Sequence, residues 1–365
     1  MILFLFFVVA LALLLEKISL NLPVRNVRYH IGASKYSVEQ GEKFYIVTTI
    51  ENRTKHNISY LRIKERIPSC VRLCGEEGIV SEEEGEHTLF VRKYERVKRS
   101  IPVVSYLRGV HPFGKSELSF GDFLGIREIS CEKEPTDKIL VYPRRIESEK
   151  LDRIVNDLMG DITAKSFLHE DPLLVRGYRE YTGREPLKSI SFLQSAKCMQ
   201  LMVKEFDHTR TPVANILFDV EFLGDFDHYF EQRETQFSLA RMICESFVER
   251  GIHHRIITNM CYPEMETRGV NVVEGAGSGG FSRILDLLSI ASGAAVCSSG
   301  ELLSYAKEYF CEGAFLYIAQ RDCPEVREEL GRYFPGEEGV LYTFFGSEYE
   351  EDYRAGAEEK EGGAA

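Results

Sequence analysis

The chain has no excess of positive charge. Its 365 residues include 45 Lys and Arg against 57 Asp and Glu, which gives a formal net charge of −12. A protein whose main partner is nucleic acid needs a positive face that binds phosphates and releases their counterions. We therefore expect no nucleic-acid function, although this composition still allows a local basic patch.

The sequence also lacks the cysteine spacing of a disulfide framework or a zinc site. Its nine cysteines form no C-x-x-C pair and no repeated interval, and the closest pair is Cys70 and Cys74. An odd, dispersed set predicts buried, reduced thiols in a cytosolic environment. Without a second pair or a nearby His, Cys70 and Cys74 are expected to be structural.

No Lys or Arg precedes the apolar run at the N-terminus, residues 1–15, MILFLFFVVALALLL. A helix of this length would measure about 22 Å against a hydrocarbon core of ~30 Å. A secretory signal needs a basic start and a small-residue cleavage site, and neither is present. The sequence therefore predicts a retained single-pass anchor in the lipid bilayer over residues 1–22. Because the cations follow the run, the positive-inside rule places the main body in the cytoplasm.

Residues 23–142 contain short β-rich segments separated by turn residues. The apolar and β-branched runs are 43–51, 58–67, 87–92 and 96–104. Their spacing predicts an antiparallel β-sandwich. Residues 108–126 predict a hairpin turned by Gly and Pro, and residues 76–86 predict a solvated loop.

After residue 142 the pattern changes. Residues 143–212 are expected to be a polar signature and linker, and residues 213–220, VANILFDV, are typical of a parallel strand covered on both faces. Further helix and strand patterns follow, with Gly251 expected to cap the first helix: 230–247, 254–258, 281–290, 301–310, 314–319, 322–330 and 340–345. This order predicts a doubly wound α/β domain over residues 213–346. Residues 347–365 are acidic and rich in Gly and Ala, and predict a disordered tail.

The stretch from Val175 to Asp219 joins a polar segment rich in Arg and Lys to the apolar strand that ends at Asp219. It resembles the bacterial family called domain of unknown function fifty-eight, whose pattern runs R-x-Y-x-x-G-D-x-x-R-x-I-x-W-x-x-x-A-R into a strand of a von Willebrand factor A-like (vWA) domain. The positions in register are Arg179, Tyr181, Lys188, Ile190, Phe192, Ala196 and Lys197. The chain departs from the pattern at Arg184-Glu185, where the family has Gly-Asp, and at Phe192, where it has Trp. The resemblance implies a vWA-like (Rossmann-type) fold and partnership with a MoxR-type AAA+ ATPase.

In vWA domains a D-x-S-x-S motif holds a divalent cation, and the resemblance places Asp219 at its first position. Glu221 and Leu223 replace the two serines, and Leu223 has no ligand atom. Asp219, Glu221, Asp225 and Asp227, closed by Thr258, could still form a different oxygen site for Mg²⁺. The favoured interpretation is that Asp219 hydrogen-bonds the turn that follows it, so no cofactor is expected.

The charged signature residues allow two interpretations. They could form a docking surface for a partner, or an ion-pair lattice that clamps the segment onto the α/β sheet. The residues concerned are Arg179, Glu180, Arg184, Glu185, Lys188, Lys197 and Lys204, with Tyr181, Ile190 and Phe192 among them.

Two other motifs are expected to carry no chemistry. Residues 275–280, GAGSGG, match G-x-G-x-x-G but lie late in the fold, and no acidic residue ends a strand about 20 residues later. A flexible loop before a helix is favoured. His253 and His254 would point to opposite faces of a strand, which excludes shared ligation, and both are expected to be partly exposed. No nucleophile lies beside an evident base.

The sequence thus predicts a membrane-anchored, non-enzymatic vWA-like scaffold or adaptor that works with a MoxR-type AAA+ ATPase. One alternative is a divalent-metal-dependent protein-binding module with a rearranged adhesion site. A nucleotide-dependent enzyme built on residues 275–280 is the other.

Overall fold

The computed structural model describes residues 26–75, 78–80, 84–121, 127–167, 175–206, 213–222, 229–262, 269–275, 277–310, 314–335 and 341–355. The predicted anchor, residues 1–22, lies outside these ranges. Within them, no helix combines the length and the apolar character that a membrane span requires. The chain divides into two compact units, the first of which contains the residues up to Arg144, residues 285–291 and those from Tyr353 onward.

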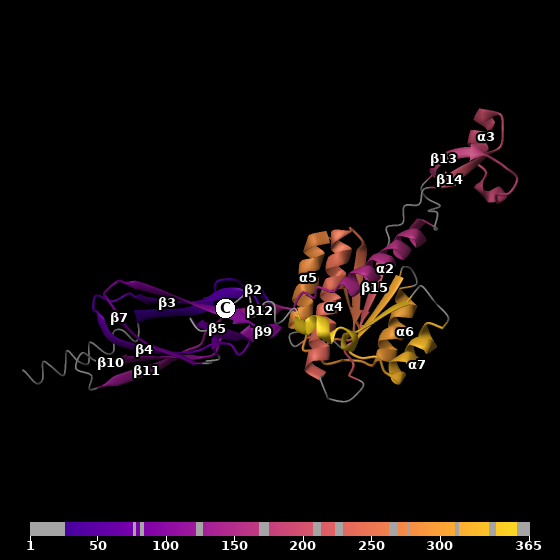
Figure 1. Cartoon of the computed structure of the whole chain (residues 1–365). Coiled ribbons are helices and arrows are strands. Elements are labelled where there is room, and N and C mark those ends of the chain that lie inside the picture. Colours follow the sequence, from indigo (N-terminus) through magenta and orange to yellow (C-terminus); the bar gives the residue numbers. More distant parts are fainter. Residues whose placement is uncertain are drawn as a thin grey trace, which may run out of the picture. The chain divides into compact units, whose positions relative to one another are not determined.

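Residues 27–142, the larger part of the first unit, form strands (Figure 1). Their bounds are β1 Val27–Ala33, β2 Ser37–Glu39, β3 Lys43–Asn52, β4 Ile58–Arg66, β5 Val71–Gly75, β6 Gly78–Val80, β7 Glu84–Val91, β8 Arg96–Ser105, β9 Gly109–Pro112, β10 Ser116–Gly121, β11 Glu128–Lys133 and β12 Lys138–Tyr142. They form three sheets of order β1-β3-β8-β5-β6, β11-β10-β4-β7 and β2-β12-β9.

The two larger sheets enclose a shared core. Alternate residues of β3 are buried, as expected for a strand with one face on a core. Ile50 of β3 packs in one apolar cluster with Leu61 and Ile63 of β4 and Phe120 of β10. The prediction of antiparallel β-rich packing is therefore confirmed, and the four predicted strands correspond to β3, β4, β7 and β8.

Glu65 of β4 is a buried carboxylate inside this unit, with no exposed surface. Its Oε1 accepts hydrogen bonds from the Thr48 hydroxyl at 2.6 Å and the Tyr29 hydroxyl at 3.0 Å. Burial raises the pKa of Glu65, although these two hydrogen bonds oppose the shift. Burial and the nearby Arg99 guanidinium lower the pKa of His87 to about 4, so this imidazole is neutral at pH 7.

The raised pKa of Glu65 predicts how stability depends on pH. The folded chain binds this proton more tightly than the unfolded chain, so the stability that protonation contributes is lost as pH rises through the folded pKa. Glu65→Gln keeps an acceptor for Thr48 and Tyr29 and removes this titration. Relative to the wild type, the variant should gain on the order of 1 kcal/mol between pH 4 and pH 8 in urea unfolding. A constant difference across that range would contradict the assignment.

The second unit contains the remaining helices and strands, except that residues 285–290 at the end of α5 belong to the first unit. Their bounds are α2 Glu149–Phe167, β13 Val175–Glu180, η1 Leu187–Ser189, α3 Phe192–Cys198, β14 Met202–Phe206, β15 Val213–Phe218, α4 Tyr229–Glu249, β16 His253–Thr258, β17 Asn271–Glu274, α5 Gly277–Ile290, α6 Ser299–Tyr309, β18 Ala314–Ala319, α7 Pro324–Tyr333, β19 Leu341–Phe345 and η2 Gly346–Glu348. The helix and strand patterns predicted after residue 212 are all present. Gly251 ends α4 with a φ of 66°, which a glycine adopts without strain.

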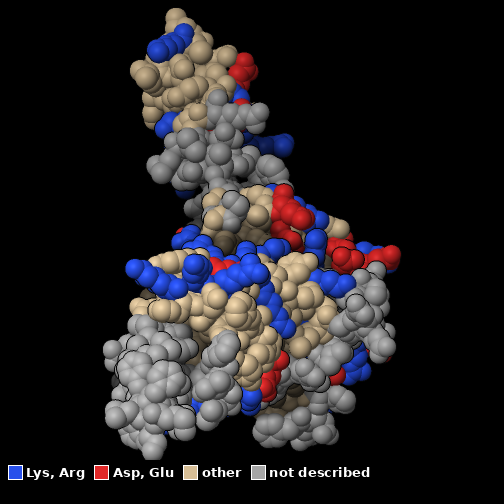
Figure 2. Space-filling view, turned by 90° about the vertical axis from the view of Figure 1, so that its left-hand side faces the viewer, with Lys and Arg blue, Asp and Glu red and all other residues tan. Residues whose placement is uncertain are grey.

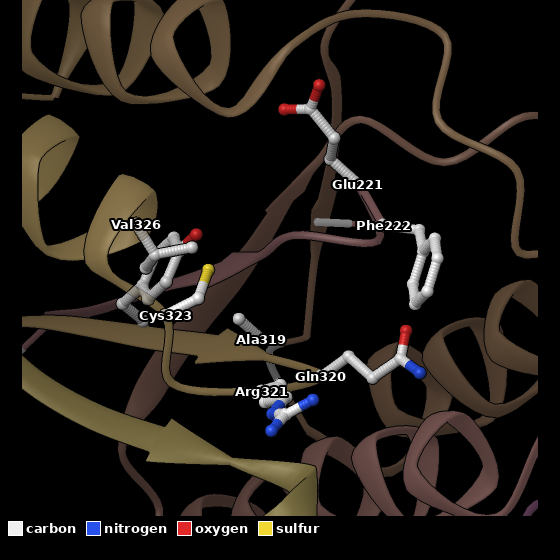
Figure 3. A pocket seen from close by; sticks show the side chains of 8 residues that line it. Glu221, Phe222, Ala319, Gln320, Arg321, Cys323 and Val326 are labelled. Atoms are coloured by element: carbon white, nitrogen blue, oxygen red, sulfur yellow. The ribbon is translucent and has the colours of Figure 1, made fainter. Parts of the chain in front are cut away.

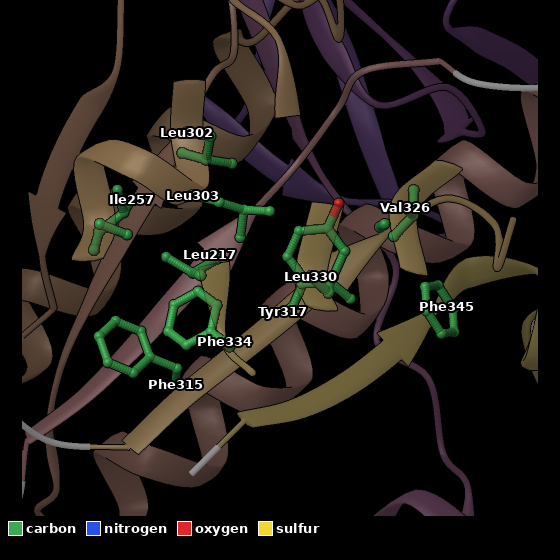
Figure 4. Packing of buried hydrophobic residues seen from close by; sticks show 12 residues of the cluster. Leu217, Ile257, Leu302, Leu303, Phe315, Tyr317, Val326, Leu330, Phe334 and Phe345 are labelled. Carbon is green, nitrogen blue, oxygen red and sulfur yellow. The ribbon is translucent and has the colours of Figure 1, made fainter. Parts of the chain in front are cut away.

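The main sheet of this unit has the order β17-β16-β15-β18-β19, in which β17 alone is antiparallel. Helices α6 and α7 cover one face, where Leu217 and Tyr317 pack against Leu303 and Leu330 (Figure 4). Helix α4 covers the other face, where the Phe237 ring meets the Phe218 ring with 5.0 Å between centroids. Because both faces are covered, β15 and β18 are apolar along almost their whole length.

Several sequence predictions need correction. Residues 108–126 do not form a hairpin, because β9 pairs with β12 while β10 pairs with β4 and β11 in another sheet. The predicted loop at residues 76–86 contains β6, and the predicted linker at 143–212 contains α2 and the elements from β13 to β14. Residues 347–355 of the predicted disordered tail are ordered, because Tyr349 and Tyr353 are buried, and residues 356–365 lie outside the described ranges. These segments are polar in sequence and were therefore predicted to be irregular. Buried aromatic side chains and pairing between strands distant in sequence determine their structure instead.

Candidate functional site

Asp219 follows β15 directly, at the point where the strand order of the sheet reverses. From β15 the chain passes to β16 on one side, and β18 is the neighbour on the other side. Open α/β sheets place ligand sites at this position, beyond the carboxyl ends of the strands. The Asp219 N–H donates to the Ile318 carbonyl of β18 at 2.9 Å, so the backbone is still held by the sheet.

Asp219 is almost fully buried, with 1% of the residue's surface exposed, and its carboxylate accepts hydrogen bonds from several groups. Its Oδ1 accepts from the Asn259 amide at 2.8 Å and from the Glu221 N–H at 2.9 Å. Its Oδ2 accepts from the Tyr317 hydroxyl at 2.5 Å. The predicted hydrogen bond to the turn after Asp219 is therefore confirmed, and two further donors come from β18 and the residue after β16.

Burial raises the pKa of Asp219, and the hydrogen bonds from Ser299, Tyr317, Asn259 and the Glu221 backbone oppose this shift. Asn259 also ties the neighbouring loops together, because its Oδ1 accepts from the Val220 N–H at 3.0 Å and its amide donates to the Cys297 carbonyl at 3.1 Å. The buried carboxylate is thus the centre of a network that joins the ends of three strands.

Glu221 is bound at the N-terminus of α6. Its Oε2 accepts from the Ser299 N–H at 2.5 Å and from the Ser299 hydroxyl at 2.7 Å. A carboxylate at this end of a helix is stabilised by the free N–H groups and the helix dipole. The helix also has its own cap, since Ser298 and Glu301 form a capping box. The Glu221 side chain therefore holds the loop after β15 to the start of α6.

These contacts do not fit a divalent cation. A cation requires six or more oxygen lone pairs directed at one point, whereas N–H and O–H donors surround Asp219. The Thr258 hydroxyl is fully buried and accepts from the Met260 N–H at 3.2 Å. Leu223, Asp225 and Asp227 lie outside the described residues. Among the residues that are described, no group of three or more His, Cys, Asp or Glu side chains could hold a metal ion.

A small pocket of about 270 Å³, part of it open solvent, lies beside this network. Its lining includes Glu221, Phe222, Gln320 and Cys323 (Figure 3). Burial raises the pKa of the Cys323 thiol, and burial with nearby carboxylates raises the pKa of Cys297 to about 11. Both thiols are therefore protonated at neutral pH and are poor nucleophiles.

The glycine-rich run does not have the setting of a dinucleotide site. It follows β17, the antiparallel edge strand, and α5 begins inside it at Gly277. A Cβ on Gly275 would lie 2.3 Å from His254 Nε2, and one on Gly280 would lie 2.6 Å from the Gly275 backbone. These glycines allow close packing, and the helix starts at Gly277, four residues earlier than predicted. His254 is buried rather than partly exposed, while His253 points outward.

The signature forms a small module of its own, residues 175–206, in which β13 pairs with β14. Arg179 Nη1 donates to Glu185 Oε1 at 2.5 Å, and Glu185 also accepts from the Thr182 N–H and hydroxyl. These hydrogen bonds, from Thr182 first and then Arg179, lower the pKa of Glu185 to about 2. Arg179 and Glu185 therefore stabilise the turn after β13.

Few side chains of this module are buried, and several large apolar ones are exposed. Ile190 is buried and forms a bridge to Val203. The exposed residues, which we call the apolar face, are Leu187, Phe192, Leu193, Met199 and Leu201. Phe192 is 75% exposed and Met199 93%. Lys188 and Lys197 are exposed beside them, whereas Tyr181 is partly buried and donates its N–H to the Leu201 carbonyl.

Comparisons with known proteins support no assignment by homology. No family model matches the chain. The uncharacterized protein YeaD of Bacillus subtilis (strain 168) is 22% identical over 200 residues, which are 54% of this chain and 48% of YeaD. The chain therefore aligns with about half the length of that relative.

Two solved structures share short, weak likenesses with the chain. They are the Pseudomonas fluorescens alkylpurine DNA glycosylase AlkC bound to abasic DNA (12% identity, 30% of each chain, TM-score 0.18) and the CARDB domain of PF1109 from Pyrococcus furiosus with di-metal ions (6% identity, 32% of this chain and 93% of that one, TM-score 0.20). At these scores the likenesses say nothing about what this chain does.

Proposed function

We propose that the chain is a membrane-anchored, non-enzymatic vWA-like scaffold or adaptor that works with a MoxR-type AAA+ ATPase. The observation that carries the proposal is the apolar face of residues 175–206. The segment with the family-like signature exposes five large apolar side chains on a module of 32 residues. Exposed apolar patches of this kind mark binding sites for partner proteins.

The α/β unit supports the vWA-like part of the proposal. Its strand order places β15 at the centre, β16 and the antiparallel β17 on one side, and β18 and β19 on the other. Taken with the helices on both faces, this is a doubly wound arrangement, as the resemblance implies. The first unit, with two sheets around one core, serves as the β-sandwich in this interpretation.

The network around Asp219 supports a structural role for the former metal position. Its carboxylate is engaged by protein donors, and Glu221 is held by α6. The neighbouring thiols Cys297 and Cys323 have raised pKa values and are not activated for nucleophilic chemistry. These features favour binding without metal gating and without covalent catalysis.

The anchor completes the proposal. The uncharged apolar run at residues 1–15, extended to residue 22, would hold the chain in the membrane with its main body on the cytoplasmic side. The eight cysteines for which the structure gives a state are free thiols, which suits a reducing compartment.

Co-purification tests the function. The full chain, extracted from membranes of its native host in mild detergent, is expected to retain an AAA+ ATPase at near-stoichiometric yield. Mass spectrometry of the eluate identifies the partner. If the full chain is recovered in folded form and no AAA+ ATPase is found in the eluate in any of several detergents, the proposed partnership with an ATPase is wrong.

A further inference from the structure

One end of the first unit carries a group of exposed cations, which we call the basic tip. It consists of two turns, residues 52–57 between β3 and β4 and residues 92–95 between β7 and β8, together with Arg96. The pairing of Glu51 with Arg96 and of Ile58 with Val91 brings both turns to the same end. The exposed cations of the tip are Arg53, Lys55, Arg92, Lys93 and Arg96, and the other exposed residues are His56, Asn57 and Tyr94.

The tip has a surplus of positive charge. Glu51 lies 3.0 Å from Arg53 and 3.5 Å from Arg96, and Glu95 accepts from the Arg92 backbone N–H. Within the described part of the chain, the side chains of Lys55, Arg92 and Lys93 make no ion pair. Figure 2 views the chain from the side where β7 and β10 are labelled in Figure 1, and Lys and Arg side chains gather across the face that it shows.

Asn52 makes the tip rigid. It is fully buried, and its amide donates to the His56 carbonyl at 2.9 Å and the Arg92 carbonyl at 2.8 Å, so it joins the two turns. Lys93 is fixed in the same way, because its N–H donates to Asn57 Oδ1 at 2.9 Å. The cations are therefore presented on an ordered surface.

Tyr94 stands at the centre of the second turn and is 64% exposed. Its φ of 56° lies in the left-handed region, which side chains other than glycine rarely adopt. The turn thus holds an aromatic ring outward among cations, and Tyr rings partition into the headgroup layer of membranes.

The chain enters the first unit at this tip. Val27, the first residue of β1, pairs with Asn52, and four residues, 23–26, separate it in the sequence from the predicted anchor, residues 1–22. Four residues span at most about 14 Å when fully extended. A chain anchored through residues 1–22 therefore keeps the tip within reach of the lipid headgroups.

We propose that the basic tip binds the anionic phospholipid headgroups of the leaflet in which the chain is anchored. The inference rests on the proposed function, because the anchor sets the distance between the tip and the bilayer. Basic surfaces beside a membrane segment are attracted by anionic lipid, and the attraction weakens beyond a Debye length. The tip would thereby be a second contact with the membrane, which would restrict the orientation of the first unit relative to the bilayer.

The absence of tryptophan from the chain permits a direct test. The full-length variant Tyr94→Trp is reconstituted into phosphatidylcholine liposomes with or without about one-third phosphatidylglycerol. In anionic liposomes the single tryptophan should emit further to the blue and be quenched at least about threefold more by headgroup spin-labelled lipid, because the cations draw the tip to the surface. Raising salt to about 0.5 M should reverse this effect, as should the added substitutions Lys55→Glu and Lys93→Glu.

Tyr36→Trp is the matched control. Tyr36 is 65% exposed and lies between β1 and β2, at the opposite end of β1 from Val27. Its quenching should be the same in both lipid mixtures. If the tryptophan at 94 is quenched no more than the one at 36 in anionic liposomes that carry the chain, the tip does not bind lipid. If the chain fails to float with liposomes of either composition, the prediction of a membrane anchor at residues 1–22 is wrong instead.

Discussion

Replacing Phe192 and Leu193 together by Asp is expected to lower the amount of AAA+ ATPase that co-purifies with the full chain by more than about tenfold. Buried aromatic and aliphatic anchors at the centre of an interface each contribute about 2 kcal/mol or more when truncated, and 1.4 kcal/mol is a factor of ten. Phe192 is 75% exposed and Leu193 72%, so the free chain should keep its stability. The measurement is quantitative pull-down from membranes.

Tyr309→Asp is the matched control for this experiment. Tyr309 is a large side chain of α6 with 61% of its surface exposed, and it lies outside residues 175–206. This variant should retain the ATPase at the wild-type level. Equal losses in both variants would indicate a general surface effect, and undiminished binding by the Phe192, Leu193 variant would show that the apolar face is not the docking site.

Asp219→Ala is expected to destabilise the second unit by about 3 kcal/mol. The substitution leaves the Tyr317 hydroxyl and the Asn259 amide buried without their acceptor, and each such group costs about 1–3 kcal/mol. Part of this loss is offset, because the buried carboxylate is itself costly and its pKa is raised by burial. In urea unfolding the midpoint should fall by about 1–2 M.

Asp219→Asn separates the loss of the network from the loss of the charge. The amide oxygen can still accept from Asn259 and the Glu221 N–H, and the Tyr317 hydroxyl can rotate to accept from the amide nitrogen. This variant should therefore lose only about 1 kcal/mol. Millimolar Mg²⁺ should leave the wild-type midpoint unchanged. A rise in the wild-type midpoint with Mg²⁺ that is absent from Asp219→Ala would instead support the metal-dependent alternative.

Much of the fold could be predicted because its pattern is local. The strand at 314–319 was predicted with the bounds of β18, and the helix that begins near Pro324 is α7. Asp219 was recognisable as a candidate because it ends an apolar strand and because the family resemblance places it at the first position of a metal-binding motif. The segment at 108–126 was predicted wrongly, since β9 and β10 are neighbours in sequence but belong to different sheets.

The rest of the candidate site could not be predicted in the same way. Asn259, Ser299 and Tyr317 carry no motif, and each is an ordinary polar residue at the end of an element or within it. They contribute to the site only because their strands and helix lie next to β15 in the folded chain. The exposure of Phe192 and Leu193 could not be predicted either, because large apolar residues in a helix are usually buried in the core.

The sequence by itself determined most of the strands and helices after residue 212 and the position of Asp219 at the end of an apolar strand, because side-chain periodicity and strand ends are properties of neighbouring residues. Only the tertiary structure decided that donors from 40 and 98 residues away would surround that carboxylate. Only it brought the turns at 52–57 and 92–95 together into one basic surface. The physical reason is that strand order and crossover connections set long-range contacts, and a periodic pattern does not encode them.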